Sequence, residues 1–284
     1  AATGTVAFSV AAPALVPALV PREALAAANG RLELARSLAF AGGPALAGAL
    51  VGWAGTSPAF LLAGGLSGVA VLLLIGIPEP PRPALPPRHL LLDLQEGTGF
   101  AWSHRLLRPI LLTGVAWNLS WFVLQAAYVP YAVQVLGLTA SGMGITLAGF
   151  GVGMVTGAVL ARRVTARLSF GMTVAMGPLT SVAAAVLMTV TIWLPSPVLM
   201  GAAFFLFGAG PILWTISQTT LRQTVTPAAM LGRVSALFLM ALTGARPIGA
   251  AIGAAVGARD GPHSFILHAP AGVQVEAGLN ISSP

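Results

Sequence analysis

Residues 21–52 read PREALAAANGRLELARSLAFAGGPALAGALVG, and residues 227–257 read PAAMLGRVSALFLMALTGARPIGAAIGAAVG. Both stretches open with a proline, carry a Gly-Arg pair that begins at Gly30 or Gly232, and place a second proline 13 or 14 residues after the arginine of that pair. Each then continues as an apolar run with recurring small residues. Two such copies indicate an internal duplication whose unit contains a long apolar helix.

Composition places this duplicated chain in a lipid bilayer. Of its 284 residues, 56% are hydrophobic and only 7% are charged, and the mean hydropathy is +0.88. So little polar surface cannot cover a water-soluble globule. The net charge of +7 comes from arginines that lie in short gaps between apolar runs, which argues against a nucleic-acid-binding surface. The absence of cysteine excludes disulfides, thiolate metal sites and cysteine nucleophiles.

Eight apolar windows are long enough to cross a membrane, since a spanning helix needs about 20 residues. Arginines gather in the first, third, fifth and seventh gaps between these windows, and the second, fourth and sixth gaps contain no charged residue. The positive-inside rule therefore places the odd gaps in the cytoplasm. We predict an all-α, polytopic transmembrane helix bundle. Its spans are residues 1–20, 32–53, 57–77, 107–130, 142–161, 170–194, 198–221 and 234–258.

The duplication and the longest gap divide the chain. The two copies lie six spans apart, which is the spacing of a parallel six-helix repeat, and the longest gap carries a stiff proline-rich segment of the kind that joins two halves. On this division residues 1–77 belong to an N-terminal helical half, 78–106 form a cytoplasmic connector, 107–258 form a C-terminal half without its last helix, and 259–284 form an atypical tail. We therefore expect a fragment of about eight spans, with three missing in front and one behind.

These features resemble the major facilitator superfamily, whose fold is two six-helix halves around a substrate cavity. The two copies are similar to the fourth-to-fifth and tenth-to-eleventh helix regions of its enterobactin-exporter-like branch. The resemblance implies a secondary transporter of the bacterial inner membrane, a monomer that exports a drug, siderophore or other small organic molecule in exchange for protons by alternating access. It implies neither enzymatic activity nor a cofactor, and the partners are substrate, protons and lipid.

Small residues and prolines mark the second span at positions of the family's antiporter motif, and the eighth span repeats the pattern. A helix lined with glycine and interrupted by proline can approach its neighbour closely and bend. The resemblance implies proton-driven export, although tight helix packing alone accounts for the same residues. They are Gly30, Gly43, Pro44 and Gly48 on the second span, and Pro247 and Gly249 on the eighth.

The fifth gap, GAVLARRVTARLS, resembles the family's basic cytoplasmic loop motif, with Gly157, Arg163 and Arg167 at matching positions. An arginine stands near the place of the usual aspartate, so the acid of the family's gating network is absent here, and positive-inside anchoring also explains these arginines. Glu33 and Arg36 are three residues apart, which predicts an ion pair at the membrane interface. A role of that pair in gating is a second interpretation.

Polar side chains within apolar spans are costly unless they face a cavity or another helix. Asn118, Trp121, Gln125 and Tyr128 are spaced by three, four and three residues, which places them on one helical face. A stripe of aromatic and amide groups suits a large, partly polar organic ligand, and the resemblance implies that this helix borders the cavity. Hydrogen bonds between helices, with a tryptophan packed on lipid, account for the same stripe.

Three more residues are candidates for substrate binding. Trp214 and Gln218 lie one turn apart on the seventh span, although Gln218 is close enough to the cytoplasmic end to be solvated. Arg246 is the one charge deep within a predicted span, roughly 20 Å along the helix from Arg233. It can bind an anionic group of a substrate or a partner carboxylate, or be held by fixed neighbours such as helix carbonyls.

Several chemistries are missing from the pattern. No Asp or Glu lies deep in a predicted span, so the sequence offers no proton carrier. The four histidines lie in the connector and the tail without other metal ligands, and without lysine there is no phosphate-binding loop. A membrane-embedded enzyme would need an acid–base or nucleophile constellation that is not found. The alternative to an exporter is a truncated remnant of one that does not transport.

Overall fold

The computed structural model describes residues 15–54, 56–75 and 90–259, and no β-strand occurs in these ranges. Most of the predicted first span, the proline-rich part of the connector and almost all of the predicted tail lie outside the described residues. The helices are η1 (Arg22–Ala24), α2 (Leu25–Ala54), α3 (Thr56–Ile75), α4 (Leu90–Ser103), α5 (Leu107–Gln134), α6 (Ala140–Arg167), α7 (Phe170–Val190), α8 (Pro197–Val225) and α9 (Leu231–Arg259).

These helices follow the predicted spans. In the described ranges α5, α6, α7, α8 and α9 are long and apolar enough to cross a membrane, and α3 contains a shorter apolar stretch, Ser57–Leu73. Helix α2 covers the second predicted span. The prediction of an all-α transmembrane bundle is confirmed. Helix α6 continues to Arg167, six residues beyond the predicted window, because backbone hydrogen bonding does not end where the apolar run ends.

Short polar residues begin several of these helices. The side chains of Thr139, Ser169 and Ser196 accept hydrogen bonds from backbone N–H groups in the first turns of α6, α7 and α8, over 3.3–3.4 Å. Each cap satisfies one of the N–H groups that the start of a helix leaves without an internal partner. Pro197 follows its cap at the first helical position, where its missing N–H costs nothing.

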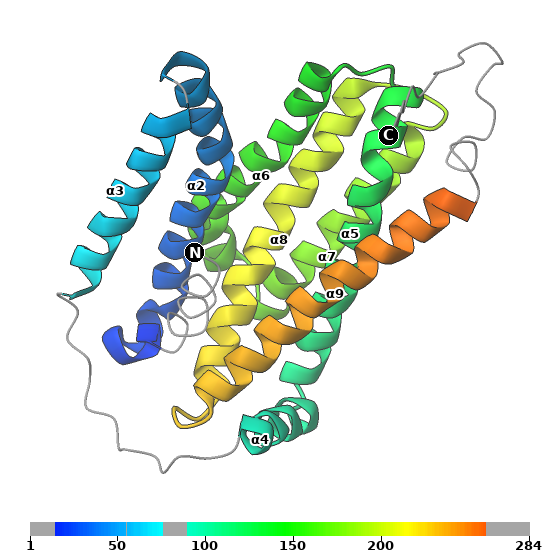
Figure 1. Ribbon diagram of the computed structural model, residues 1–284. Coiled ribbons are helices and arrows are strands. Elements are labelled where there is room, and N and C mark those ends of the chain that lie inside the picture. The colour runs from blue at the N-terminus through cyan, green and yellow to red at the C-terminus, as the bar shows by residue number, and fades with distance from the viewer. Residues whose placement is uncertain (1–14, 55, 76–89, 260–284) are drawn as a thin grey trace, which may run out of the picture.

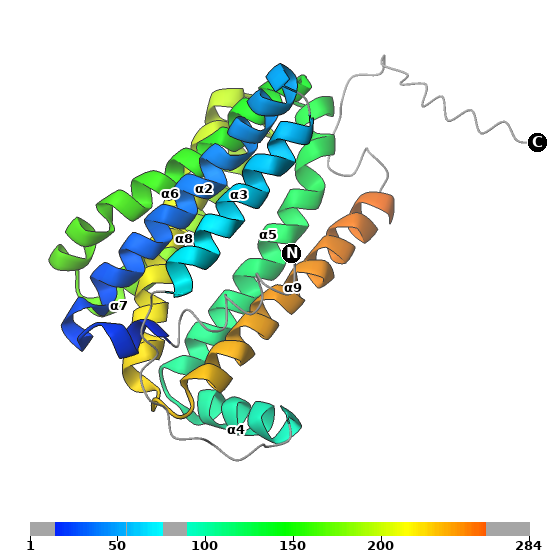
Figure 2. The ribbon, with the colours of Figure 1, turned by 60° about the vertical axis from the view of Figure 1, so that its left-hand side comes forward.

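The helices form an up-and-down bundle, in which α6, α7 and α8 make one group and α5 and α9 make another (Figure 1). Helix α8 packs against both α6 and α7, and α5 packs along α9. Helix α2 lies against α6 and touches α8, and α3 packs on α2 (Figure 2). Because successive spans run in opposite directions, the start of α2, the end of α6 and the turn between α8 and α9 lie at one end of the bundle. The arginine-rich gaps therefore share a side, as the predicted topology requires.

A helix occupies part of the predicted connector. Helix α4 lies across the arginine-rich end of the bundle (Figure 1), where Arg233 of α9 holds it with Nε 2.8 Å from Asp93 Oδ1 and Nη1 2.6 Å from Glu96 Oε2. A methyl group at Gly97 would lie 3.3 Å from the Arg233 backbone, so the two helices touch. This helix was not predicted from the sequence. The division into halves and connector stays a prediction.

Glycines bring pairs of helices into backbone contact. Along α6, a methyl group at Gly149 would lie 2.6 Å from the carbonyl oxygen of Gly201 in α8, and methyl groups at Gly153 and Gly157 would overlap the carbonyl oxygens of Phe205 and Ala209. On the other side of the bundle, Gly249 of α9 meets the carbonyl oxygen of Leu119 in α5 in the same way. Lipid offers no hydrophobic drive for helix association, so such close packing holds a membrane bundle together.

We predict that Gly153→Ala destabilises the protein by about 1–3 kcal/mol, because the new methyl group forces α6 away from α8. Gly144→Ala is the matched control on the same helix, since nothing lies within 4 Å of a methyl group there. Thermal unfolding of the detergent-purified protein measures both variants. Equal melting temperatures for the two variants would contradict the close crossing of α6 and α8.

Candidate functional site

The four residues of the predicted stripe on α5 differ in how much of their surface is exposed. Asn118, Trp121 and Tyr128 are buried, with 5%, 7% and 6% of their surfaces exposed, whereas Gln125 is exposed. Burial therefore separates Gln125 from the other three residues of the stripe. The three buried side chains contact different partners.

Trp121 and Tyr128 lie in an aromatic core between α5, α6 and α8. The Trp121 ring stacks on Phe150 with centroids 4.9 Å apart, and Tyr128 meets the edge of Phe204 at 4.8 Å. The Tyr128 hydroxyl also shares a hydrogen bond with the Thr146 hydroxyl. In this conformation both side chains pack between α5 and the neighbouring helices α6 and α8.

Asn118 instead binds the arginine that the sequence places deep in the membrane. Arg246 Nε of α9 donates a hydrogen bond to Asn118 Oδ1 over 3.1 Å, and Asn118 Nδ2 donates to the Gly114 carbonyl over 2.9 Å. The guanidinium carbon of Arg246 lies 5.7 Å from the centre of the Phe122 ring. Within the described ranges no carboxylate forms an ion pair with Arg246. An amide and an aromatic ring orient this cation, and neither neutralises it.

Trp214 and Gln218 of α8 are both buried, with 9% and 5% of their surfaces exposed. The interpretation of Gln218 as a solvated residue at the end of the helix is therefore wrong for this conformation. Gln218 Nε2 donates to Thr219 Oγ1 over 2.8 Å. Trp214 Nε1 and Gln218 Oε1 have no hydrogen-bond partner in the part of the chain that the structure describes.

Arg222 continues this face of α8 one turn further. Only 7% of Arg222 is exposed, its guanidinium carbon lies 4.8 Å from the centre of the Phe238 ring in α9, and its Nε has no hydrogen-bond partner among the described residues. The sequence pattern places Arg222 only among the arginines of a cytoplasmic gap. The spacing of four from Gln218 was the signal that could have found it.

A second polar contact joins α2 to α8. Asn29 is 4% exposed, and its Nδ2 donates to Gln223 Oε1 over 2.7 Å and lies 2.9 Å from Thr220 Oγ1. One turn later on α2, the predicted ion pair is present, with Arg36 Nη1 3.1 Å from Glu33 Oε1. Glu33 is nearly buried and Arg36 is exposed. The sequence analysis did not single out Asn29, although it precedes Glu33 by four residues and so shares its face.

The antiporter-motif residues of α2 have few described neighbours. Nothing lies within 4 Å of a methyl group at Gly30 or Gly43. Pro44 and Gly48 lie within α2, but their surroundings are outside the described part of the structure. No described residue packs closely on Gly30 or Gly43, and close helix packing at Pro44 and Gly48 stays a prediction.

The basic loop motif ends α6. Gly157 is buried against Ala209 of α8, and Arg163 and Arg167 are exposed. In the repeat on α9, Pro247 is exposed within the helix, next to Arg246. The exposed arginines fit positive-inside anchoring as well as gating.

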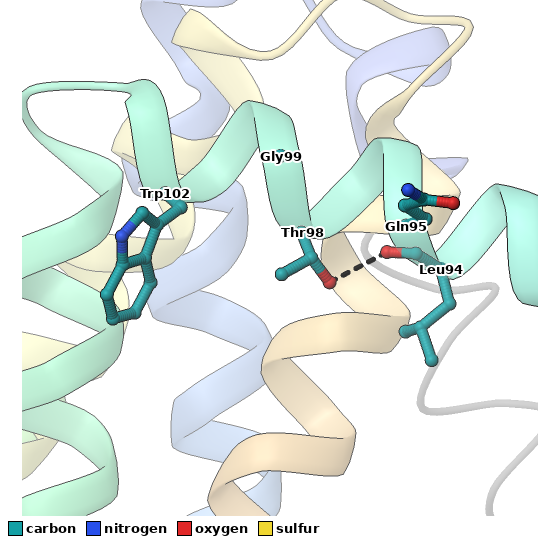
Figure 3. A pocket seen from close by; sticks show the side chains of 5 residues that line it. All are labelled: Leu94, Gln95, Thr98, Gly99 and Trp102. Carbon is teal, nitrogen blue, oxygen red and sulfur yellow. Dashed lines mark hydrogen bonds between the residues drawn. The ribbon is translucent and has the colours of Figure 1, made fainter.

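An open groove of about 500 Å³ follows the outer face of α4 (Figure 3). Its lining comes from α4 alone, and in it Thr98 donates its hydroxyl to the Leu94 carbonyl over 2.7 Å. No candidate residue of the sequence analysis lines this groove, and its walls carry no charged group. We therefore place the candidate site at the Arg246 and Asn118 contact. The lining is Leu94, Gln95, Thr98, Gly99 and Trp102.

Comparison with known proteins shows the family of the chain. Residues 1–250 match the profile of the Major Facilitator Superfamily. The chain belongs to this superfamily. Major facilitator proteins are membrane transporters, which confirms the expectation that the chain is not an enzyme.

Among curated proteins, the chain is similar to enterobactin exporters named EntS. It is 29% identical to that of Citrobacter koseri over 246 residues and 29% identical to that of Shigella boydii serotype 18 over 243 residues. Each match covers 86% of this chain and 56% of the exporter, so the chain spans about half the length of these relatives. No solved structure matches.

We predict that Asn29→Cys combined with Gln223→Cys is cross-linked by a short bismaleimide, because these side chains are in hydrogen-bond contact between α2 and α8. The chain has no other cysteine, so the background is low. Asn29→Cys with Thr224→Cys is the matched control, since Thr224 is exposed beside Gln223. Cross-linking is read from mobility on a denaturing gel after cleavage between α3 and α4. Equal yields for the two pairs would contradict the contact.

Proposed function

We propose that this chain is part of a secondary active exporter of the bacterial inner membrane, which moves a small organic molecule outward in exchange for protons by alternating access. The superfamily match and the exporter relatives support this function. We propose that the protein acts as a monomer. A siderophore of the enterobactin kind is the first cargo to test, because the relatives carry that name.

The observation that carries a binding role is the uncompensated charge of Arg246. A guanidinium at membrane depth is costly, and transporters keep such groups where they meet a substrate or a water-filled cavity. Arg246 is exposed, and in the described structure it contacts only neutral groups, the Asn118 amide and the Phe122 ring. We assign substrate binding to Arg246 and Asn118, with Trp121, Gln125, Tyr128, Trp214 and Gln218 as further contacts in other stages of the cycle.

Alternating access requires a contact at the cytoplasmic end that closes and opens. Asn29 with Gln223 and Thr220 supplies such a contact between α2 and α8. These are hydrogen bonds between neutral groups, each with a net contribution of only about 1 kcal/mol, because water replaces the partner when the helices separate. The pair of Glu33 and Arg36, and the basic end of α6, belong to the same gating region in this proposal.

Proton coupling is the part of the proposal that depends on likeness to the antiporter motif at Gly30, Gly43, Pro44 and Gly48. In the described spans the one carboxylate is Glu33, near the start of α2. The proton carrier is therefore assigned either to Glu33 or to a residue beyond the described ranges.

Transport by the full-length parent protein tests this function. Proteoliposomes with an imposed proton gradient are expected to move enterobactin, and to stop when an ionophore collapses the gradient. The cross-linked Asn29→Cys and Gln223→Cys variant is expected to lose transport and to regain it when a cleavable linker is cut. Transport that persists without the gradient would remove the proton coupling, and transport that persists in the cross-linked protein would remove the gating role.

A further inference from the structure

Three buried side chains form a polar row on one face of α8. Trp214, Gln218 and Arg222 are spaced by four residues, so they stand above one another along the helix. Each has 9% or less of its surface exposed. In each, a polar atom lacks a hydrogen-bond partner among the described residues, namely Trp214 Nε1, Gln218 Oε1 and Arg222 Nε.

Apolar side chains surround this row. Trp214 belongs to a hydrophobic cluster with Leu111 and Phe238, and the Phe238 ring lies against the Arg222 guanidinium. Buried polar groups without partners are destabilising, and a buried cation without a counter-charge is more so. Such a row is explained if it serves a polar ligand during part of the protein's working cycle.

The row leads to the site at Arg246. The Trp214 ring lies against Gly114 of α5, where a methyl group would be 3.0 Å from it, and Asn118 donates to the Gly114 carbonyl. Asn118 in turn accepts from Arg246. On α9, Phe238 beside Arg222 and Arg246 itself are eight residues apart, roughly 12 Å along the helix. The polar row and the adjoining Asn118–Arg246 contact therefore have an arginine at each end, Arg222 and Arg246.

The two charged residues of this arrangement, Arg222 and Arg246, are both positive. The described acids are Glu23 and Glu33 near the start of α2, and Asp93 and Glu96 on α4. None of them forms an ion pair with Arg222 or Arg246. Arg222 is buried and Arg246 is exposed, and each has an aromatic ring beside it and no described acid in ion-pair contact. Such a pair of cations is suited to a group that is negatively charged and aromatic.

We propose that the transported molecule is an aromatic organic anion, whose acidic group is received by Arg222 at the cytoplasmic end and passed along α8 to Arg246. Arg222 adjoins Gln223, so separation of the α2–α8 contact opens the cytoplasmic end of the row. Arg246 and Asn118 then hold the anionic group at membrane depth. This inference rests on the proposed function as an exporter, and it adds the chemical class of the cargo.

Binding of two matched probes tests the proposal. Salicylate and salicylamide share an aromatic ring and a hydroxyl group and differ in a carboxylate against a neutral amide. Equilibrium dialysis of the detergent-purified full-length parent is expected to show salicylate bound at least about ten-fold more tightly, since a charge-assisted hydrogen bond is replaced by a neutral one. Equal affinity for the two probes would overturn the proposal, because it would mean that Arg246 is already neutralised within the protein.

Substitutions of the two arginines test which residues cause the preference for salicylate over salicylamide. Arg246→Gln is expected to abolish it and Arg246→Lys to keep most of it, while Arg222→Gln weakens salicylate binding and leaves salicylamide binding unchanged. Arg105→Gln is the control, because Arg105 is exposed in the turn between α4 and α5. Gel filtration and melting temperature identify any variant that does not fold, and in that case Arg246→Lys against wild type carries the test. A preference that survives both glutamine substitutions would place the anion elsewhere and refute the assignment.

The two proposals fail separately. A parent protein that moves enterobactin with the proton gradient but binds salicylate and salicylamide equally keeps its function and loses the anion site. A parent protein that prefers salicylate through Arg246 but moves no probe keeps the site and loses the transport function.

Discussion

The structure depends on how helices can hold together in lipid. Each span satisfies its own backbone hydrogen bonds, and lipid is as apolar as the side chains that meet it, so association needs close contact between helices instead of the expulsion of water. The glycines of α6 and α9 meet this need by bringing backbone atoms against α8 and α5. At such a distance Cα–H groups contact carbonyl oxygens, and each added methyl group destabilises the packing.

Two kinds of helix contact follow, and they suit different tasks. Among α5 to α9 the contacts are glycine crossings and an aromatic core around Trp121, which form a tightly packed unit. Helix α2 joins this unit through fewer contacts. Among the described residues these include the Asn29 hydrogen bonds, the packing of Leu34 on α6 and α8, the ring contact of Phe40 with Phe150, and the approach of Ala41 to Gly151. Amide hydrogen bonds can exchange with water at modest cost, whereas interlocked backbones cannot. Relative movement is therefore expected at the α2 boundary.

The spans could be predicted because lipid imposes a simple rule on composition. Long apolar runs between arginine-rich gaps fix the number and direction of helices, and the observed α5 to α9 fall on the predicted windows. Glu33 and Arg36 were also predictable, because their interaction depends only on helical spacing. Helix α4 was missed because its 14 residues are too few to span and follow a proline-rich segment that hides the helical pattern.

The candidate site was predictable only in part, since it depends on which helices become neighbours. The depth of Arg246 followed from its position in the sequence, but its contact with Asn118 joins residues 128 positions apart. Trp121 and Tyr128 matched a ligand-binding stripe in spacing, yet tertiary packing places both in the aromatic core. The spacing of four residues from Gln218 places Arg222 on the same face of α8, but its contact with Phe238 of α9 depends on which helices become neighbours.

The account requires that α6 crosses the membrane with its basic end in the cytoplasm, and labelling of the two ends tests this most directly. Ser141→Cys and Arg163→Cys place single cysteines near the start and the end of the helix in a chain that has none of its own. In intact cells, a membrane-impermeant maleimide should label Ser141→Cys and spare Arg163→Cys, and permeabilised cells should show both labelled. Labelling of both cysteines in intact cells, or of Arg163→Cys alone, would contradict the account.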